Sequence, residues 1–202
     1  MPTRNLDDAN EVFKYLCDET IVRTIVEFTN IRLSKKNIAA DVSIDEFYAY
    51  IGILTLLGVL KKRSVDVSEI WNEKSVHYID VVCATMTRER FKLLSRYITF
   101  DDIHTREDRV QTDKKFFKFR QVFNHIRAKC QTAYEPGCHT CVDEELYPFR
   151  GRFQARQYMP KKPARYGIKI WQLVDSKTHY LLNFDVYLEK KATKSQEVLE
   201  RK

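Results

Sequence analysis

The spacing of apolar residues changes once along the sequence, at the turn-forming stretch Glu135-Pro136-Gly137. Before it, apolar residues recur every three or four positions, a spacing that places them on one face of a helix. After it, three short segments rich in β-branched and aromatic residues are separated by turn-forming residues: 139–143, 166–174 and 179–188. The sequence therefore predicts an α+β chain in which helices precede a small antiparallel sheet.

Polar residues mark where several of these helices begin. Asp8 and Ser43 each precede a glutamate by three residues, the spacing of a capping box. Thr87 precedes another apolar helical pattern and is a third expected cap. The first helical face is broken near residues 17–20, and a later face extends from Phe116 to Cys130. We therefore expect several separate helices before the sheet.

The excess positive charge of the chain is concentrated in one region. The formal net charge is +7, from 35 Lys and Arg against 28 Asp and Glu. Between Leu146 and Val174 there are basic residues but no acidic ones. The seven are Arg150, Arg152, Arg156, Lys161, Lys162, Arg165 and Lys169. A localised positive patch of this kind is typical of a protein that binds a polyanionic partner, and the overall basic charge supports nucleic acid.

Other features of the composition argue against a membrane or secreted protein. The most apolar stretch, residues 47–60, is too short for a bilayer and contains two glycines, so we interpret it as a buried helix. Residues 1–13 lack the apolar core of a secretion signal. Five cysteines, an odd number, favour reduced thiols in the nucleus or cytoplasm. We expect no membrane association.

Three motifs occur in order in the second half: DEELYPFRGR at residues 143–152, PKKPARYGIK at 160–169 and DSKT at 175–178. Together they resemble the start of the catalytic domain of piggyBac-type transposases and of the domesticated proteins derived from these transposable elements. Weaker similarity continues upstream, so that the resemblance spans most of residues 11 to 188.

The resemblance implies a domain organisation and a chemistry. Residues 1–137 correspond to a helical dimerisation and DNA-binding domain. Residues 138–188 correspond to a ribonuclease H-like catalytic domain of which only the first three antiparallel strands are expected, so we interpret it as truncated, with residues 189–202 as a charged tail. In the family, three aspartates hold two Mg²⁺ ions that drive DNA cleavage and strand transfer, a reaction that requires clustered carboxylates.

Asp143 matches the first of these three aspartates, and the segments that would carry the other two are not reached. Asp175 matches the hairpin turn instead. Neighbours on a strand face opposite sides, so Glu144 is expected to point away from Asp143, whereas Glu145 shares its face. We therefore expect Asp143 to bind Mg²⁺ only weakly unless other ligands complete the site. No cofactor is expected for this chain alone.

The seven basic residues of the patch are interpreted as contacts to DNA phosphates, with a solvated loop as the alternative. The aromatic residues among them (Phe149, Phe153, Tyr158 and Tyr166) fit either base stacking or packing beneath the loop, and we favour packing. Cys138 and Cys141 have the spacing of a zinc knuckle, but no second pair follows. We expect no zinc site.

The sequence thus predicts a nuclear, or otherwise cytoplasmic, DNA-binding protein derived from a piggyBac transposase. Self-sufficient cleavage and strand transfer are not expected, and whether the chain is an enzyme stays open. The alternative is a non-enzymatic partner that forms a homodimer, or a heterodimer with a related full-length protein, and acts as a dominant-negative regulator. In an incomplete sheet the strand that carries Asp143 would lie at an edge, and such an edge invites pairing with another chain.

Overall fold

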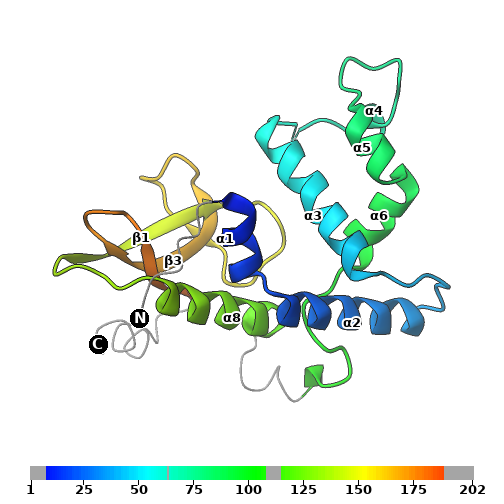
Figure 1. The fold of residues 1–202 in the computed structure, drawn as a ribbon. Helices are drawn as coiled ribbons and strands as arrows, with labels where there is room; N and C mark the ends of the chain where they lie inside the picture. Colours follow the sequence, from blue (N-terminus) through cyan, green and yellow to red (C-terminus); the bar gives the residue numbers. More distant parts are fainter. Residues whose placement is uncertain (1–7, 63, 108–114, 189–202) are drawn as a thin grey trace. The chain divides into compact units, whose positions relative to one another are not determined.

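The computed structural model describes residues 8–62, 64–107 and 115–188 (Figure 1). Within these ranges the chain forms seven helices followed by four strands, and this order confirms the predicted α+β class. The helices are α1 (Ala9–Leu16), α2 (Glu19–Lys35), α3 (Ile44–Val59), α4 (Val67–Ile70), α5 (Asp80–Thr85), α6 (Arg88–Tyr97) and α8 (Phe117–Ala133). The strands are β1 (Thr140–Pro148), β2 (Gln157–Tyr158), β3 (Tyr166–Asp175) and β4 (Leu181–Val186).

The chain divides into two compact units. One unit is Glu19–Thr105 and contains α2 to α6. The other combines Met1–Asp18 with Arg106–Lys202, and it contains α1, α8 and the whole sheet. Helix α8 is therefore packed in one unit with the strands that follow it.

The segments expected from the sequence were defined by function, as a helical domain at 1–137, a catalytic domain at 138–188 and a tail at 189–202. The compact units are divided at other positions, because α8 belongs with the sheet. The functions of the first two segments stay predictions. The tail lies outside the described residues.

In the helical unit, α3 and α6 begin where the sequence predicts them. The Ser43 side chain caps α3 by accepting a hydrogen bond from the backbone N–H of Glu46 (3.1 Å), and Thr87 caps α6 in the same way through Arg90 (3.3 Å). The apolar stretch 47–60 lies largely in α3 and buries three residues in the core. None of the described helices is both long and apolar enough to cross a membrane.

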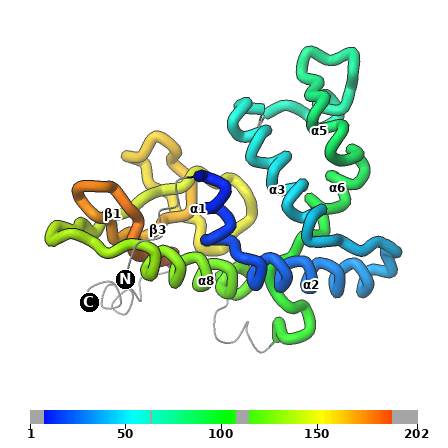
Figure 2. The backbone as a smooth tube through the Cα atoms, in the orientation of Figure 1, coloured from blue at the N-terminus to red at the C-terminus, as the bar shows by residue number. Residues whose placement is uncertain are grey.

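Helices α3 and α6 pack through aromatic rings. The ring of Phe91 lies 5.3 Å from that of Tyr50 and 5.1 Å from that of Trp71, and the Tyr50 hydroxyl lies 3.2 Å from Ser95 Oγ. Figure 2 traces the chain from α3 through the short helices to α6. A hydrogen-bonded ion pair between Arg90 and Glu46 joins the same two helices. The hydrogen bond to Glu46 raises the pKa of Arg90. The unit therefore has its own core.

In the other unit, α8 connects α1 to the sheet. On one side, the Tyr15 hydroxyl of α1 lies 3.1 Å from Thr132 Oγ1 of α8. On the other side, the ring of Phe123 meets that of Phe184 in β4 edge-on at 4.9 Å. Burying aromatic rings in this way is a large apolar contribution to stability. Helix α8 is thus held on both sides within one core.

Strand β3 is the centre of the sheet. Along one of its edges it pairs antiparallel with β1, and along the other it pairs with β2 and then β4. The three predicted strands are present, but β1 extends to Pro148, five residues beyond the predicted end at 143. The two-residue strand β2 was not predicted. The extension of β1 and the strand β2 were missed because charged residues interrupt the alternation of apolar side chains.

A buried carboxylate fixes the register at the start of β1. Asp175 accepts hydrogen bonds from the backbone N–H groups of Gly137, Lys177 and Thr178, each at 2.9 Å. The residue is only 2% exposed, and these donors lower its pKa to about 2. Asp175 is the last residue of β3, and its carboxylate joins the turn after α8 to the turn of the β3–β4 hairpin.

The stability of this unit should depend on the ionisation of Asp175. Its pKa in the folded state is below the value of about 3.9 for an unfolded aspartate. The stabilisation is therefore complete above about pH 4 and is lost as the pH falls towards 2. We expect Asp175→Asn to lower the urea midpoint at neutral pH, with a difference from wild type that shrinks towards pH 2. A difference independent of pH would contradict this role.

Candidate nucleic-acid interface

Asp143 lies in the middle of β1, directly opposite Gln172 of β3, and it is exposed. Glu145 is two residues further along the strand and therefore faces the same side. The Gln172 amide donates to the Glu145 carboxylate (3.0 Å) and lies 3.1 Å from the Tyr147 hydroxyl. Burial, followed by the hydrogen bond to Glu145, raises the pKa of Tyr147. The face of Asp143 thus carries a polar network.

Glu144 faces the opposite side of the sheet, as predicted. It forms an ion pair with Lys169 of β3. The Lys169 ammonium also lies over the rings of Trp171 (4.4 Å) and Tyr187 (5.2 Å), and the side chain is 16% exposed. The charge of Lys169 is therefore held within the sheet, which distinguishes it from the other predicted DNA contacts.

The Asp143 carboxylate accepts a hydrogen bond from the backbone N–H of Glu144 (2.7 Å). The backbone N–H of Phe149 donates to the carbonyl oxygen of Tyr166 in β3 (3.2 Å). Because backbone N–H groups alternate in direction along an antiparallel strand, those of the odd-numbered β1 residues point to β3 and that of Glu144 points away from it. Among the described strands, β1 pairs only with β3. The Asp143 side chain therefore satisfies the Glu144 N–H on the edge of β1 that has no partner strand among those described.

The other edge of the sheet shows the same arrangement. In β4, Asn183 Oδ1 accepts from the N–H of Phe184 and Asp185 Oδ1 accepts from the N–H of Val186, both at 2.9 Å. These side chains satisfy backbone donors that would otherwise attract another strand. Capping of an edge N–H by the preceding side chain is thus a repeated feature of this sheet.

The carboxylates near Asp143 do not form a closed metal site. Glu144 is turned to Lys169, and Glu145 is hydrogen-bonded to Gln172. In residues 8–62, 64–107 and 115–188, no group of three His, Cys, Asp or Glu side chains is placed to hold a metal ion. The donor set of these residues therefore does not fit a two-Mg²⁺ centre. Cys138 and Cys141 are exposed thiols, and the expectation of no zinc stays a prediction.

The structure divides the predicted DNA-binding residues into groups. Arg150, Arg152 and Arg156 lie in the loop between β1 and β2, and the other three loop cations lie between β2 and β3: Lys161, Lys162 and Arg165. Lys169 is in β3. Arg156 donates to the carbonyl oxygens of Arg150 (3.0 Å) and Gly151 (3.2 Å), so it holds the first loop together.

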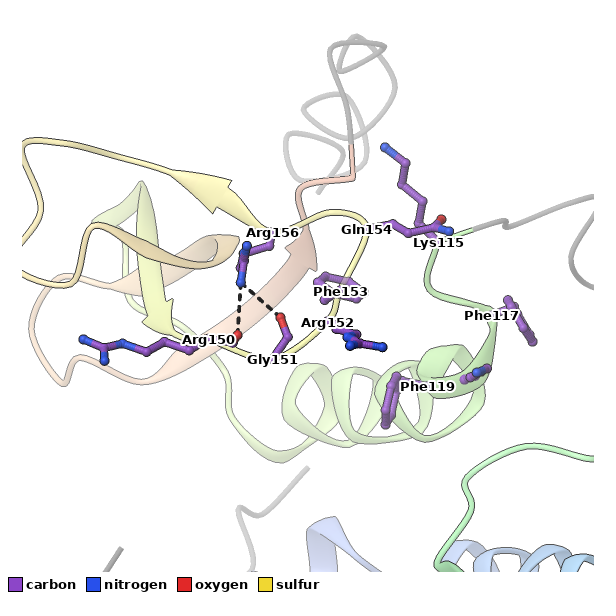
Figure 3. Close-up of a pocket in the computed structure, with 10 residues that line it drawn as sticks. Lys115, Phe117, Phe119, Arg150, Gly151, Arg152, Phe153, Gln154 and Arg156 are labelled. Atoms are coloured by element: carbon purple, nitrogen blue, oxygen red, sulfur yellow. Dashed lines mark hydrogen bonds between the residues drawn. The ribbon is translucent and has the colours of Figure 1, made fainter. Parts of the chain in front are cut away.

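The loop between β1 and β2 and the start of α8 line an open pocket of about 750 Å³ (Figure 3). Five of its lining residues are basic, three are phenylalanines and none of these described residues is acidic. The lining consists of Lys115, Phe117, Lys118, Phe119, Arg150, Gly151, Arg152, Phe153, Gln154 and Arg156. The pocket thus combines positive charge with aromatic surface.

The α8 side of this pocket was not predicted from the sequence. Lys115 and Lys118 are far from the basic patch in the chain, and acidic residues in the preceding segment make the local charge unremarkable. The available signal was the alternation of phenylalanine and cations in residues 115–120. Helix α8 has no acidic residue in its first turn and no side-chain cap, so its dipole adds to the positive potential.

Two of the aromatic residues in the basic patch pack beneath the loop, the role that we favoured. The ring of Phe153 lies 6.3 Å from that of the buried Phe116 and 6.4 Å from that of Phe149. Tyr158 and Tyr166 contact each other at 4.8 Å and are half exposed. The rings thus connect the loop to α8.

Comparison with known proteins gives consistent matches. A family model described as Transposase IS4 matches residues 8–202. The human PiggyBac transposable element-derived protein 3 is 24% identical over 164 residues, which are 80% of this chain and 26% of that protein. The human PiggyBac transposable element-derived protein 2 is 24% identical over 162 residues, or 79% and 26%. The chain thus spans about a quarter of the length of these relatives.

A solved structure shows the same fold. It is a cryo-EM structure of a piggyBac transposase synaptic complex with hairpin DNA, with a TM-score of 0.83 and 33% identity over 94% of this chain and 40% of that one. The three motifs on the sheet, the α+β fold and the family match agree, and we conclude that this chain belongs to the piggyBac family of transposases and transposase-derived proteins.

Proposed function

We propose that this chain binds DNA, through the basic pocket between α8 and the β1–β2 loop, and that it does not cleave or join DNA by itself. The observation that carries the proposal is the pocket lining, with five basic residues and no acidic one among the described residues. Such a surface attracts the phosphate backbone of DNA, because each phosphate that a lysine or arginine neutralises releases counterions. The structural relative in complex with hairpin DNA supports the same ligand.

The lining residues have different parts in this proposal. Arg150, Arg152 and Lys118 are exposed and serve as phosphate contacts, with arginine able to bind two oxygens at once. Arg156 serves mainly to hold the loop, since its guanidinium binds two loop carbonyl oxygens and lies over the Tyr166 ring at 5.3 Å. These contacts position the duplex with little choice of sequence.

The second cationic loop extends the same proposal. Lys161 and Arg165 are exposed and Lys162 is half-buried, so these side chains add phosphate contacts outside the pocket. Lys169 is left out, because Glu144 and two aromatic rings hold its ammonium group. Since duplex DNA is the proposed ligand, the nucleus is the proposed compartment.

The proposed lack of self-sufficient chemistry follows from the donor set. Two metal ions that activate one oxygen and stabilise another need several shared carboxylates. The described residues offer Asp143 on that face, with Glu145 committed to Gln172. We propose that Asp143 binds Mg²⁺ weakly, and only where substrate phosphates or another protein complete the ligand shell.

The alternative is a non-enzymatic dimerisation partner, either of a second copy or of a related transposase. The edge of β1 favours it, because β1 has no second partner among the described strands. Val142 is 45% exposed on this strand. Exposed apolar edge strands are natural templates for pairing with another chain.

The first of three predictions from this proposal concerns the pocket cations. The triple variant Lys118→Ala, Arg150→Ala, Arg152→Ala should bind duplex DNA more weakly than wild type in fluorescence anisotropy. Each phosphate contact contributes about 0.9 to the slope of log affinity against log salt, so the slope should fall by about three. The loss of affinity should be similar for DNA duplexes of unrelated base sequence.

A matched control tests whether net charge alone explains the effect. The variant Lys35→Ala, Lys36→Ala, Lys74→Ala removes the same charge from exposed positions in the helical unit. It should retain most of the affinity. Equal losses for the two variants, or no binding by wild type at low salt, would exclude the pocket as the DNA interface.

The second prediction concerns Asp143. With Mg²⁺, the purified chain should leave supercoiled plasmid uncut on agarose gels, and Asp143→Asn should be indistinguishable from wild type. Asparagine keeps the side-chain oxygen that accepts from Glu144, so the variant should also bind DNA normally. Mg²⁺-dependent nicking that disappears in Asp143→Asn would show that the chain is an active nuclease.

The third prediction tests the alternative by light scattering after size exclusion. If a second copy pairs with β1, wild type should be a dimer and Val142→Lys should shift it towards monomer, because a charge on an edge strand opposes pairing. Val76→Lys is the control, since Val76 is 93% exposed in the other compact unit. A wild-type monomer at high protein concentration would reject pairing with a second copy.

A further inference from the structure

The pocket contains more aromatic surface than phosphate contacts require. Three phenylalanines line it, and Phe119 is 44% exposed even though it lies in the first turn of α8, a helix that packs against the sheet. The exposed ring is next to the buried Phe116 at 6.0 Å, so the underlying cluster supports it from one side. An exposed ring held by a packed neighbour is a suitable surface for stacking a planar group.

The surroundings of these rings favour an anionic partner. Lys118 and Arg152 line the same pocket, and Figure 3 shows Arg150 extending away from the three rings. Gln154, the remaining polar side chain of the lining, has an amide that can both donate and accept a hydrogen bond. The pocket therefore offers a stacking surface, cations and an amide in one place.

The volume of the pocket suits a single nucleotide. A volume of about 750 Å³ is in the range of sites that enclose a molecule of nucleotide size. Bases within a duplex are stacked on one another and cannot reach rings inside a pocket. An unpaired base can enter and stack there, while its flanking phosphates meet the cations.

We propose that this pocket binds an unpaired nucleotide of DNA, whose base stacks on Phe119 while Lys118 and Arg152 contact the adjacent phosphates. The inference rests on the proposed DNA-binding function and adds a preference for single-stranded or unpaired positions. The duplex on either side would lie along Arg150 at the pocket and along the cations of the second loop.

The experiment uses the full chain and three fluorescent probes of one sequence that contain 2-aminopurine: a single strand, a perfect duplex, and a duplex with the 2-aminopurine unpaired. Stacking on the protein should change the fluorescence of the single-stranded and unpaired probes and leave the perfect duplex unaffected. The unpaired probe should bind about tenfold more tightly than the perfect duplex, the gain expected from one stacked base.

Phe119→Leu is the central variant, because leucine retains apolar contact with Phe116 but removes the flat ring. It should lose about tenfold in affinity for the unpaired probe and lose the fluorescence change. Any loss of affinity for the perfect duplex should be smaller than this, and an unchanged far-UV circular dichroism spectrum would show that the variant is folded. Tyr158→Leu is the control, since Tyr158 is a 54% exposed ring that does not line the pocket.

The outcomes separate this inference from the proposed function. Duplex binding with no preference for unpaired probes, or equal losses in Phe119→Leu and Tyr158→Leu, would overturn the inference and leave DNA binding intact. Failure to bind any probe at low salt would overturn both. Tighter binding of the RNA version of the single strand would reject single-stranded DNA as the ligand.

Discussion

The Asp175 carboxylate is the interaction on which the sheet depends. It accepts hydrogen bonds from the turn that follows α8 and from the turn between β3 and β4, and it is almost completely buried. Ser176 N–H also donates to His139 O at 3.0 Å, just before β1 begins. These bonds fix where β1 starts against β3, and the pairing then continues to Pro148 opposite Gly167. A shift of one residue would turn Asp143 to the other face.

That register in turn decides where the charges lie. It places Glu144 beside Lys169, so one cation is neutralised within the sheet. It also brings β3 so close to β1 at Gly167 that a Cβ atom there would lie 2.2 Å from the Tyr147 carbonyl oxygen. The loop that leaves β1 after this close pairing carries Arg150 and Arg152 towards α8. The basic pocket is therefore a consequence of strand pairing.

Much of the fold could be predicted because its signals are local. The caps at Ser43 and Thr87 and the break between α1 and α2 depend on residues only a few positions apart. The opposite directions of Glu144 and Glu145 follow from the alternation of a strand. The full length of β1 was missed because acidic residues and Pro148 obscure that alternation. The α8 half of the pocket was missed because nothing near Lys118 in the sequence indicates its spatial neighbours.

The sequence by itself determined the α+β order, the family resemblance and the strand position of Asp143, because periodicity and motifs depend on residues close together in the chain. Only the tertiary structure decided which cations face solvent, which one is bound to a carboxylate, and that phenylalanines from α8 line the same pocket as loop arginines. The physical reason is that the net effect of a charge or a ring depends on its neighbours in space. Those neighbours come from segments that the chain brings together only when it folds.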